Sequence, residues 1–319
     1  MEEIKNGSTR YSPNQGDQTL VEAIAKKYNV NSNRVIITIG AEQGLFASMF
    51  ATLSKGDSVA FLTPSYPAYE GIATMLGARS IFIKNDAHGR PDLKDLKRAL
   101  SKARVLVCCS PNNPDGRVLT KEEVDNIACI AKEHKTLIIA DECYEFLSFK
   151  EHTSFLSTNA QVIKLSSASK QFSATGIRVG WMVVPDGWKD QFVKIQNMSI
   201  TCAPVAEQRA VAQCITNHIE YTDMRHAFKT RSARACSILD RAGIPYIKPE
   251  GAFYLFVKVP TDDYAFCIKL AQEKGILIVP GSAFGNGKGF VRISLTATEK
   301  EIIHGMEQIT EFILGEQNG

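Results

Sequence analysis

The chain has 319 residues, of which 44% are hydrophobic and 22% are charged, and its formal net charge is +3. This length is enough for roughly two domains with a large core, and the composition is that of an ordinary globular protein. The small net charge, without a dense Lys/Arg cluster, argues against nucleic-acid binding, and the longest apolar runs are too short to span a bilayer.

From about residue 20 to residue 185, short apolar runs alternate with longer segments of helical periodicity. The expected strands are 35–39, 58–62, 80–83, 105–109, 136–140, 162–165 and 180–184. The expected helices are 20–28, 41–54, 69–76, 93–100 and 121–133, the last opened by a capping-box pattern at Thr120 and Glu123. This alternation predicts an α/β fold with a mostly parallel sheet that helices cover on both faces.

The pattern changes after Pro185, where two helical segments precede a set of short strands. Helices are expected at 190–197, 204–239 (with a break near Glu220-Tyr221), 265–274 and 299–314, and strands at 245–247, 252–259, 276–280 and 290–295. These elements predict a second, smaller α+β unit. We expect a large domain over residues 1–225 and a small C-terminal domain over residues 226–319.

The eight cysteines include no CxxC pair and no Cys/His group with zinc-ligand spacing, so no metal site is expected. Most lie in apolar runs, such as those around Cys108 and Cys129, where buried, reduced thiols are expected. The N-terminal MEEIKNGSTRY resembles neither a signal peptide nor a transit peptide. A cytoplasmic protein is the resulting expectation.

Lys170 is the most informative residue, because a strand-like run delivers it and because of its neighbours. Ser167 and Ser169 precede it, and Arg178 follows it by eight residues. A lysine in this setting can form a Schiff base with an aldehyde cofactor, while hydroxyls and a guanidinium can hold that cofactor's phosphate. A surface lysine in a serine-rich loop is the alternative interpretation. The segment resembles the pyridoxal-phosphate (PLP) attachment site of class I/II aminotransferases, which are enzymes of fold type I.

The resemblance extends to residues that would contact the cofactor ring. Asp141 ends an apolar strand and matches the family's aspartate at the pyridine nitrogen, although a strand-end aspartate can also cap a turn. Tyr144 and Asn113 match side chains that bond the ring oxygen, and Asn113 would also contact substrate. Asp115 stands where the family usually has threonine, which we interpret as a local turn substitution.

A phosphate cup is implied where the strand at 35–39 meets a helix, because backbone N–H groups at a helix N-terminus attract anions. Its expected members are Gly40, Ala41, Glu42, Ser167, Ser169 and Arg178, with Tyr11 reaching the phosphate of a neighbouring subunit. If Tyr11 has that role, the active form is at least a dimer.

Two further positions complete the expected site. Tyr66 matches an aromatic residue stacked on the cofactor, so Lys170, Asp141 and Tyr66 are the catalytic candidates. Arg292 lies inside an apolar strand and matches the arginine that binds the substrate α-carboxylate; an intramolecular salt bridge is the alternative. The segment 250–254 also resembles the family, and we expect it to be structural.

The resemblance covers residues 11 to about 310 and implies a homodimeric, PLP-dependent aminotransferase acting on an α-amino acid and a 2-oxo acid. Family members usually carry several dozen residues before the Tyr11 segment, and this N-terminal arm is expected to be absent. The same scaffold hosts β-eliminating lyases, decarboxylases and oxidases, and a non-catalytic PLP-binding module is a more distant alternative. A second substrate-binding cation is not identified by motif; Arg10, Arg90 and Arg117 stay open.

Overall fold

The computed structural model describes residue 5 and residues 9–86, 89–219 and 222–318. Its large sheet has seven strands in the order β1-β7-β6-β5-β4-β2-β3, and all neighbours are parallel except β7, which is antiparallel to β1 and β6. The strands are Val35–Thr38 (β1), Ser58–Leu62 (β2), Arg79–Ile83 (β3), Val105–Cys109 (β4), Leu137–Asp141 (β5), Val162–Ser167 (β6) and Gly180–Val183 (β7). The predicted mostly parallel sheet is confirmed.

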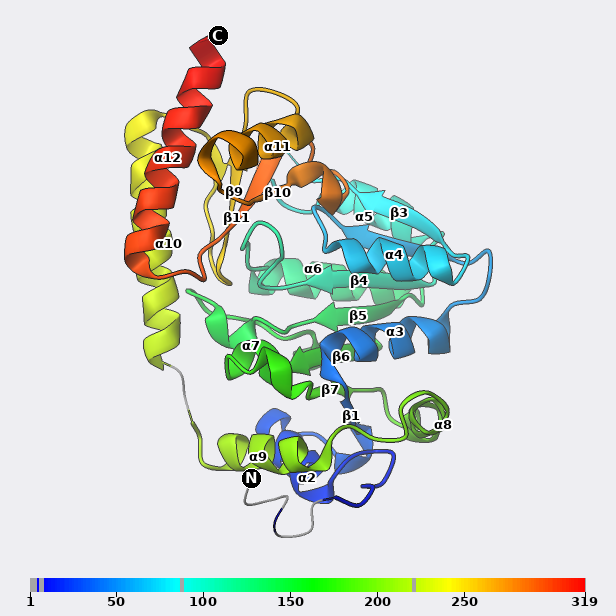
Figure 1. Cartoon of the computed structure of the whole chain (residues 1–319). Coiled ribbons are helices and arrows are strands. Elements are labelled where there is room, and N and C mark those ends of the chain that lie inside the picture. Colours follow the sequence, from blue (N-terminus) through cyan, green and yellow to red (C-terminus); the bar gives the residue numbers. More distant parts are fainter. Residues whose placement is uncertain (1–4, 6–8, 87–88, 220–221, 319) are drawn as a thin grey trace.

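Helices cover both faces of this sheet (Figure 1). One face packs against Gly40–Thr52 (α3), Pro67–Met75 (α4) and Lys189–Ser199 (α8). The other face packs against Gln18–Tyr28 (α2), Leu93–Leu100 (α5), Lys121–Glu133 (α6) and Val205–Thr216 (α9). Because strand residues alternate between the two faces, nearly every residue of the central strands is buried, as in β4 and β6.

The C-terminal part builds a second core around a four-stranded antiparallel sheet in the order β10-β11-β9-β8. Its strands are Tyr246–Ile247 (β8), Tyr254–Lys258 (β9), Val279–Pro280 (β10) and Phe290–Ser294 (β11). Its helices are Thr222–Ala242 (α10), Asp263–Lys274 (α11) and Glu299–Asn318 (α12). In Figure 1 this unit lies at one end of the large sheet, with α10 and α12 side by side. The domain boundary at residue 225 stays a prediction.

Two expectations need correction. The strand expected over 276–280 is reduced to Val279–Pro280, because the segment before it is exposed, with Leu277 at 86%, and pairs with no strand. Cys129 is exposed rather than buried, because the buried stripe of α6 runs through Val124, Ile127, Ala128 and Ala131 and leaves Cys129 on the other face. The break expected at Glu220-Tyr221 lies outside the described residues.

The carboxyl ends of the parallel strands meet at one edge of the large sheet, facing the small sheet. In the strand register Asp141 pairs with Cys109 of β4 and with Leu165 of β6. The loop after β4, the end of β5 and the turn after β6 therefore open at the same edge, where ligands bind in open α/β sheets. Across the described residues, no helix is both long and apolar enough to cross a membrane.

Candidate active site

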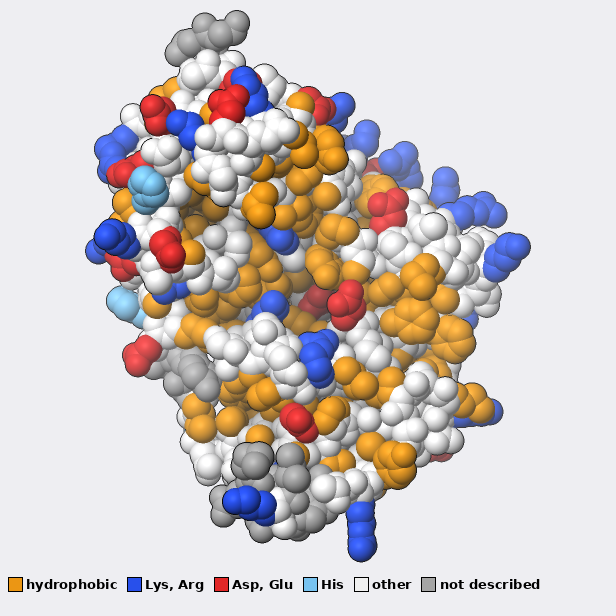
Figure 2. Space-filling model, in the orientation of Figure 1, with side chains coloured by type: hydrophobic (Ala, Val, Ile, Leu, Met, Phe, Trp, Pro, Cys, Tyr) orange, Lys and Arg blue, Asp and Glu red, His pale blue; other side chains and the backbone are white. Residues whose placement is uncertain are grey.

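A cleft of about 350 Å³ lies between the strand ends of the large sheet and the face of β9 and β11. Figure 2 shows the molecule hollowed between the two units, with both cationic and acidic side chains in the hollow. Its walls are formed by Ala41, Glu42, Leu45, Tyr66, Tyr69, Asn113, Asp141, Cys143, Tyr144, Ser167, Ser169, Lys170, Thr175, Arg178, Tyr254 and Arg292.

Lys170 is carried by a one-turn helix, Ala168–Gln171 (α7), which begins where β6 ends. The Ser167 hydroxyl oxygen caps this turn by accepting a hydrogen bond from the Ser169 N–H (3.0 Å). The turn leaves the half-buried Lys170 side chain in the cleft, with Nζ 5.6 Å from the Phe253 ring centroid. Burial, and then the positive charges of Arg292 and Arg178, lower the pKa of Lys170. This environment favours the neutral, nucleophilic amine.

Arg178 forms a cationic end of the cleft and is held by two backbone oxygens and one hydroxyl oxygen. Its Nη1 donates to Thr175 O (2.9 Å) and to Ser169 Oγ (3.4 Å), and its Nη2 donates to Ile39 O (3.4 Å). Gly40 begins α3 with φ +72°, and a Cβ there would lie 2.5 Å from Arg178 Nη2. Glycine at this position therefore lets the guanidinium and the first N–H groups of α3 approach one anion together.

The two serines of the lysine segment differ in what their hydroxyls can still do. Ser167 Oγ donates to Val179 O (3.2 Å) in addition to capping α7, so its proton is already used. Ser169 Oγ accepts from Arg178, which leaves its proton free to donate toward the cleft. The structure thus favours Ser169 over Ser167 as a hydroxyl donor to an anion.

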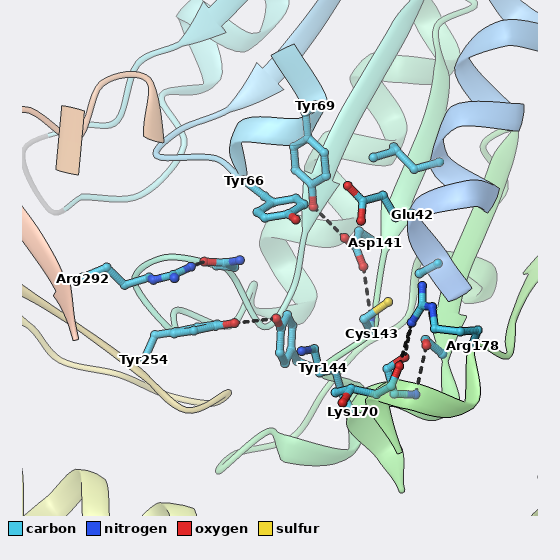
Figure 3. Close-up of a pocket in the computed structure, with 16 residues that line it drawn as sticks. Glu42, Tyr66, Tyr69, Asp141, Cys143, Tyr144, Lys170, Arg178, Tyr254 and Arg292 are labelled. Atoms are coloured by element: carbon cyan, nitrogen blue, oxygen red, sulfur yellow. Dashed lines mark hydrogen bonds between the residues drawn. The ribbon is translucent and has the colours of Figure 1, made fainter. Parts of the chain in front are cut away.

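Glu42 is exposed in the first turn of α3, and its carboxylate projects into the cleft (Figure 3). The described residues offer it no hydrogen bond or salt bridge. Its negative charge, after burial, contributes to the raised pKa of Tyr66 and acts on that phenol more strongly than Asp141 does. Glu42 therefore places an unpaired negative charge in a cup that would otherwise suit an anion.

Asp141 is fixed at the end of β5 by two donors. Tyr69 donates its hydroxyl to Oδ2 (2.7 Å), and the Cys143 N–H donates to Oδ1 (3.2 Å). Burial, and then the Asp141 charge, raise the pKa of Tyr69 well above its ordinary value, so this phenol stays protonated and keeps donating. Tyr66, directly before α4, meets Tyr69 edge to face at 5.7 Å between ring centroids.

Arg292 enters from the small sheet, on the opposite side of the cleft from Arg178 (Figure 3). Its Nη1 donates to Asn113 Oδ1 (2.9 Å), while its buried Nε has no partner among the described residues. The rings of Tyr254 and Phe284 lie 4.6 and 5.0 Å from Cζ. No carboxylate of the described residues pairs with it, so the intramolecular salt bridge weighed above is not formed there. A guanidinium held this way still has N–H groups that can donate to the carboxylate of a ligand.

The opposing tyrosines Tyr144 and Tyr254 share a hydrogen bond, with their hydroxyl oxygens 2.8 Å apart. Burial, and then the neighbouring Tyr254, raise the pKa of Tyr144 well above its ordinary value. Tyr144 therefore keeps a proton that it can donate into the cleft. Asn113 lies nearby in the buried turn after β4, where Asp115 accepts from Asn112 Nδ2 (2.9 Å) and from the Arg117 N–H (3.1 Å).

The cleft gathers almost all the residues singled out in the sequence, and Gly40 lies directly behind it against Arg178. Tyr11 does not line the cleft and is 84% exposed, so its role toward a neighbouring subunit stays a prediction. Of the open cations, Arg90 pairs with Glu250 and Arg117 with Asp115, both outside the cleft wall.

Sequence reasoning missed Tyr69 and Tyr254 as site residues. Tyr69 follows Tyr66 by three residues at the start of a helix, a spacing that places both on one face and could have indicated it. Tyr254 had no such signal, because its position depends on how β9 pairs with β11.

The fold and the cleft place the amine of Lys170 between the guanidinium groups of Arg178 and Arg292, at the strand ends of an α/β sheet. A family model, aminotransferase class I and II, matches residues 2–309. The aspartate aminotransferase of Thermotoga maritima is 30% identical over 323 residues, covering 97% of this chain and 85% of that protein. A probable N-acetyl-LL-diaminopimelate aminotransferase of Bacillus subtilis is 30% identical, covering 98% and 83%.

Solved structures agree with the sequence comparison. The crystal structure of an aromatic aminotransferase from Pyrococcus horikoshii superposes with a TM-score of 0.94 at 29% identity, covering 99% of this chain and 91% of that one. The chain belongs to the class I and II aminotransferases. It is a transferase of fold type I that moves amino groups.

Proposed function

We propose that this aminotransferase holds PLP on Lys170 and moves an amino group between an α-amino acid and a 2-oxo acid. The observation that carries the proposal is the convergence of Lys170, Asp141, Arg178 and Arg292 on one cleft. A cation cup, a carboxylate and a lysine amine match the phosphate, the pyridine nitrogen and the aldehyde of that cofactor. The glycine cradle at Gly40 and the unpartnered Nε of Arg292 further support the fit, leaving room for an anion at each end.

Each side chain then has a defined task. Arg178, Ser169 and the first N–H groups of α3 would hold the phosphate, and Asp141, oriented by Tyr69, would keep the pyridine nitrogen protonated. Tyr144 and Asn113 would contact the ring oxygen, and Tyr66 would cover the ring face. PLP, when bound, supplies an electron sink for the carbon that loses its proton.

The side chain of Lys170 would transfer the Cα proton of the substrate. Arg292 would bind the α-carboxylate in a bidentate fork and orient the Cα–H bond toward the lysine. Lys170 Nζ, with its lowered pKa, acts as the base that accepts the Cα proton and later as the acid that returns it. The substrate carboxylate and Asn113 would both bind Arg292. Substrate binding would therefore alter the contacts of Asn113, which is also proposed to contact the ring oxygen of the cofactor.

We also propose that the active form is a homodimer. Helices α3 and α4 carry the exposed apolar side chains Phe46, Phe50 and Met75, with exposed fractions of 37%, 55% and 76%, and Figure 2 shows an apolar patch over these helices. Such a patch is typical of an association surface. Sedimentation analysis of the active protein should give twice the chain mass; full activity in a monomer would contradict the dimer.

A cytoplasmic location is a further proposal, supported by eight cysteines that are all free thiols.

The visible absorption spectrum of the purified protein with PLP tests the proposed chemistry. Addition of single amino acids from a panel should convert the band of the lysine-bound cofactor to that of pyridoxamine phosphate, and the converting amino acid identifies the donor. Release of pyruvate and ammonia would instead indicate a lyase, and release of carbon dioxide a decarboxylase. A folded protein that binds no PLP would contradict the proposal.

A further inference from the structure

Tyr254 occupies a position that links two parts of the site. Its hydroxyl lies 2.8 Å from that of Tyr144, and its ring lies 4.6 Å from Arg292 Cζ. The side chain is almost completely buried, at 6% exposure, so neither contact is exchanged freely for water. Figure 3 shows Arg292 and Tyr254 entering from the same side, with the hydroxyl of Tyr254 directed at Tyr144.

The sheet register fixes this placement. Arg292 of β11 pairs with Phe256 of β9, and Ser294 pairs with Tyr254. Residues that pair across antiparallel strands share a face, and so do residues two apart along a strand. Tyr254 is therefore the diagonal neighbour of Arg292 on the face that lines the cleft, and the backbone itself keeps ring and guanidinium together.

We propose that Tyr254 is a positioning residue that couples the carboxylate-binding arginine to the tyrosine at the cofactor's ring oxygen. Its ring supports the Arg292 guanidinium, and its hydroxyl donates to Tyr144 Oη. This inference rests on the proposed PLP site. It assigns a role in the chemistry to a residue that the sequence suggests is only structural.

The direction of the hydrogen bond follows from what Tyr144 must do. If Tyr144 donates its proton to the ring oxygen, its own oxygen is left to accept, and Tyr254 is the donor that faces it. A hydroxyl that accepts one hydrogen bond becomes a stronger donor in the next. Tyr254 thereby strengthens the contact to the ring oxygen and draws negative charge away from it. With PLP bound, this contact would favour the deprotonated form of the cofactor and so lower the pH midpoint of its visible band.

Two substitutions separate the contributions of hydroxyl and ring. Tyr254→Phe keeps the ring and removes the hydroxyl, so the pH midpoint of the visible cofactor band should rise by about one unit, a tenfold change in proton affinity. The dissociation constants of two unreactive carboxylates, maleate and 3-phenylpropionate, should stay within about twofold of wild type, since the ring contact is unchanged. Tyr254→Leu should show the same midpoint shift and bind both carboxylates about tenfold more weakly.

Tyr246→Phe is the matched control. Tyr246 lies on β8 of the same sheet, donates its hydroxyl to Asp240 (2.9 Å) and does not line the cleft. This variant should leave both readouts at wild-type values. In a Tyr144→Phe background, Tyr254→Phe should add no further midpoint shift, because the effect is transmitted through Tyr144. This cycle needs only conservative substitutions and so does not depend on the folding of Tyr254→Leu.

A midpoint that Tyr254→Phe leaves unchanged, or shifts equally with and without Tyr144, would overturn the role of the hydroxyl. Equal carboxylate affinities in Tyr254→Leu and Tyr254→Phe would overturn the role of the ring. A wild-type protein that shows no PLP band would overturn both the proposed function and this inference. The missing band distinguishes that result from a failure of the Tyr254 inference alone, in which the band is present.

Discussion

Two lysines six residues apart on one segment have opposite environments. Lys164, in β6, is fully buried and donates to the carboxylates of Glu142 and Glu145, which both follow β5. Lys170 faces the cleft, where the charges of Arg292 and Arg178 oppose its own and that of Asp141 favours it. Burial acts against the charge of both ammonium groups, yet the two carboxylates outweigh it and raise the pKa of Lys164, whereas Lys170 has no such partner and its pKa falls. Direct ion pairing with carboxylates, rather than burial, therefore separates the pKa values of the two lysines.

The acidic side chains around Lys164 are engaged in hydrogen bonds and ion pairs within the protein. Glu142 accepts hydrogen bonds from the Phe155 N–H (2.9 Å) and from His152 (3.2 Å) besides Lys164. Glu142, Glu145 and His152 are near enough to one another to suggest a metal site. The ammonium groups of Lys164 and of Lys27, whose Nζ is 3.8 Å from Glu145 Oε1, already supply two positive charges to these two carboxylates.

Removing the amine of Lys170, the proposed nucleophile, should have the largest effect. Lys170→Ala is expected to lower steady-state transamination by about 10⁴-fold or more, because the covalent attachment and the proton-transferring base are lost together. Its free energy of unfolding should change by less than about 1 kcal/mol, because no partner is left buried and unpaired. Enzyme assays and urea unfolding measure the two quantities. Retained steady-state turnover would contradict the assignment of Lys170.

Removing the other lysine should reverse this pattern. Lys164→Met leaves the buried carboxylate of Glu142 without its ammonium partner and leaves Glu145 with Lys27 alone, 3.8 Å away, and we expect it to destabilise the fold by about 3–5 kcal/mol. Lys121→Met is the control, because Lys121 pairs with Asp125 on an exposed helix face and should contribute less than about 0.5 kcal/mol. Urea unfolding compares the variants. Equal stabilities of Lys164→Met and the wild type would mean that the buried ion pairs contribute nothing net.

The acids of the two regions can be compared in the same way. Glu142 is neutralised by Lys164, but Glu42 faces the phosphate cup without a partner. Glu42→Gln should therefore tighten PLP binding by about tenfold, because a carboxylate no longer repels the phosphate dianion. Equilibrium titration of the visible band measures this affinity.

Two controls locate that effect. Pyridoxal, which lacks the phosphate, should bind Glu42→Gln and wild type equally well. Glu122→Gln removes an exposed carboxylate from the first turn of α6, away from the cleft, and should change neither affinity. If pyridoxal affinity rose as much as PLP affinity, Glu42 would act on the ring and not on the phosphate.

The smallest expected effect is on the pH dependence of stability. Burial opposes ionisation of Glu142, but the Lys164 charge outweighs it and lowers its pKa below the ordinary 4.5. The unfolded chain then binds more protons than the folded one below pH 4.5, so wild-type stability should decrease as the pH falls through that range. In Lys164→Met, burial without the Lys164 charge should raise the pKa of Glu142 above its ordinary value, so stability should increase as the pH falls from 7 to 5. Urea unfolding at several pH values distinguishes the two slopes.

The sequence predicted those parts of the fold and site that depend on local pattern. The strand Val105–Cys109 and the helix Lys121–Glu133 have the expected bounds, because apolar runs and a capping box mark their ends. Asp141, Arg178 and Lys170 were singled out by short motifs that resemble those of the family. The Lys164 cluster and Tyr254 were not, because both depend on strand pairing: β5 with β6 in the first case and β9 with β11 in the second. Register brings together residues that no local pattern relates.

The close contact between Gly40 and Gly180 limits which amino-acid substitutions this sequence can accept during evolution. A Cβ at position 180 would lie 2.5 Å from the carbonyl carbon of Gly40 and 2.7 Å from the backbone nitrogen of Ala41, so no side-chain rearrangement could make room for it. Neither glycine needs to touch a substrate for its replacement to be harmful. In a library of random variants, functional proteins should almost never carry a substitution at either position. Second mutations that restore function should be rarer for these two positions than for others.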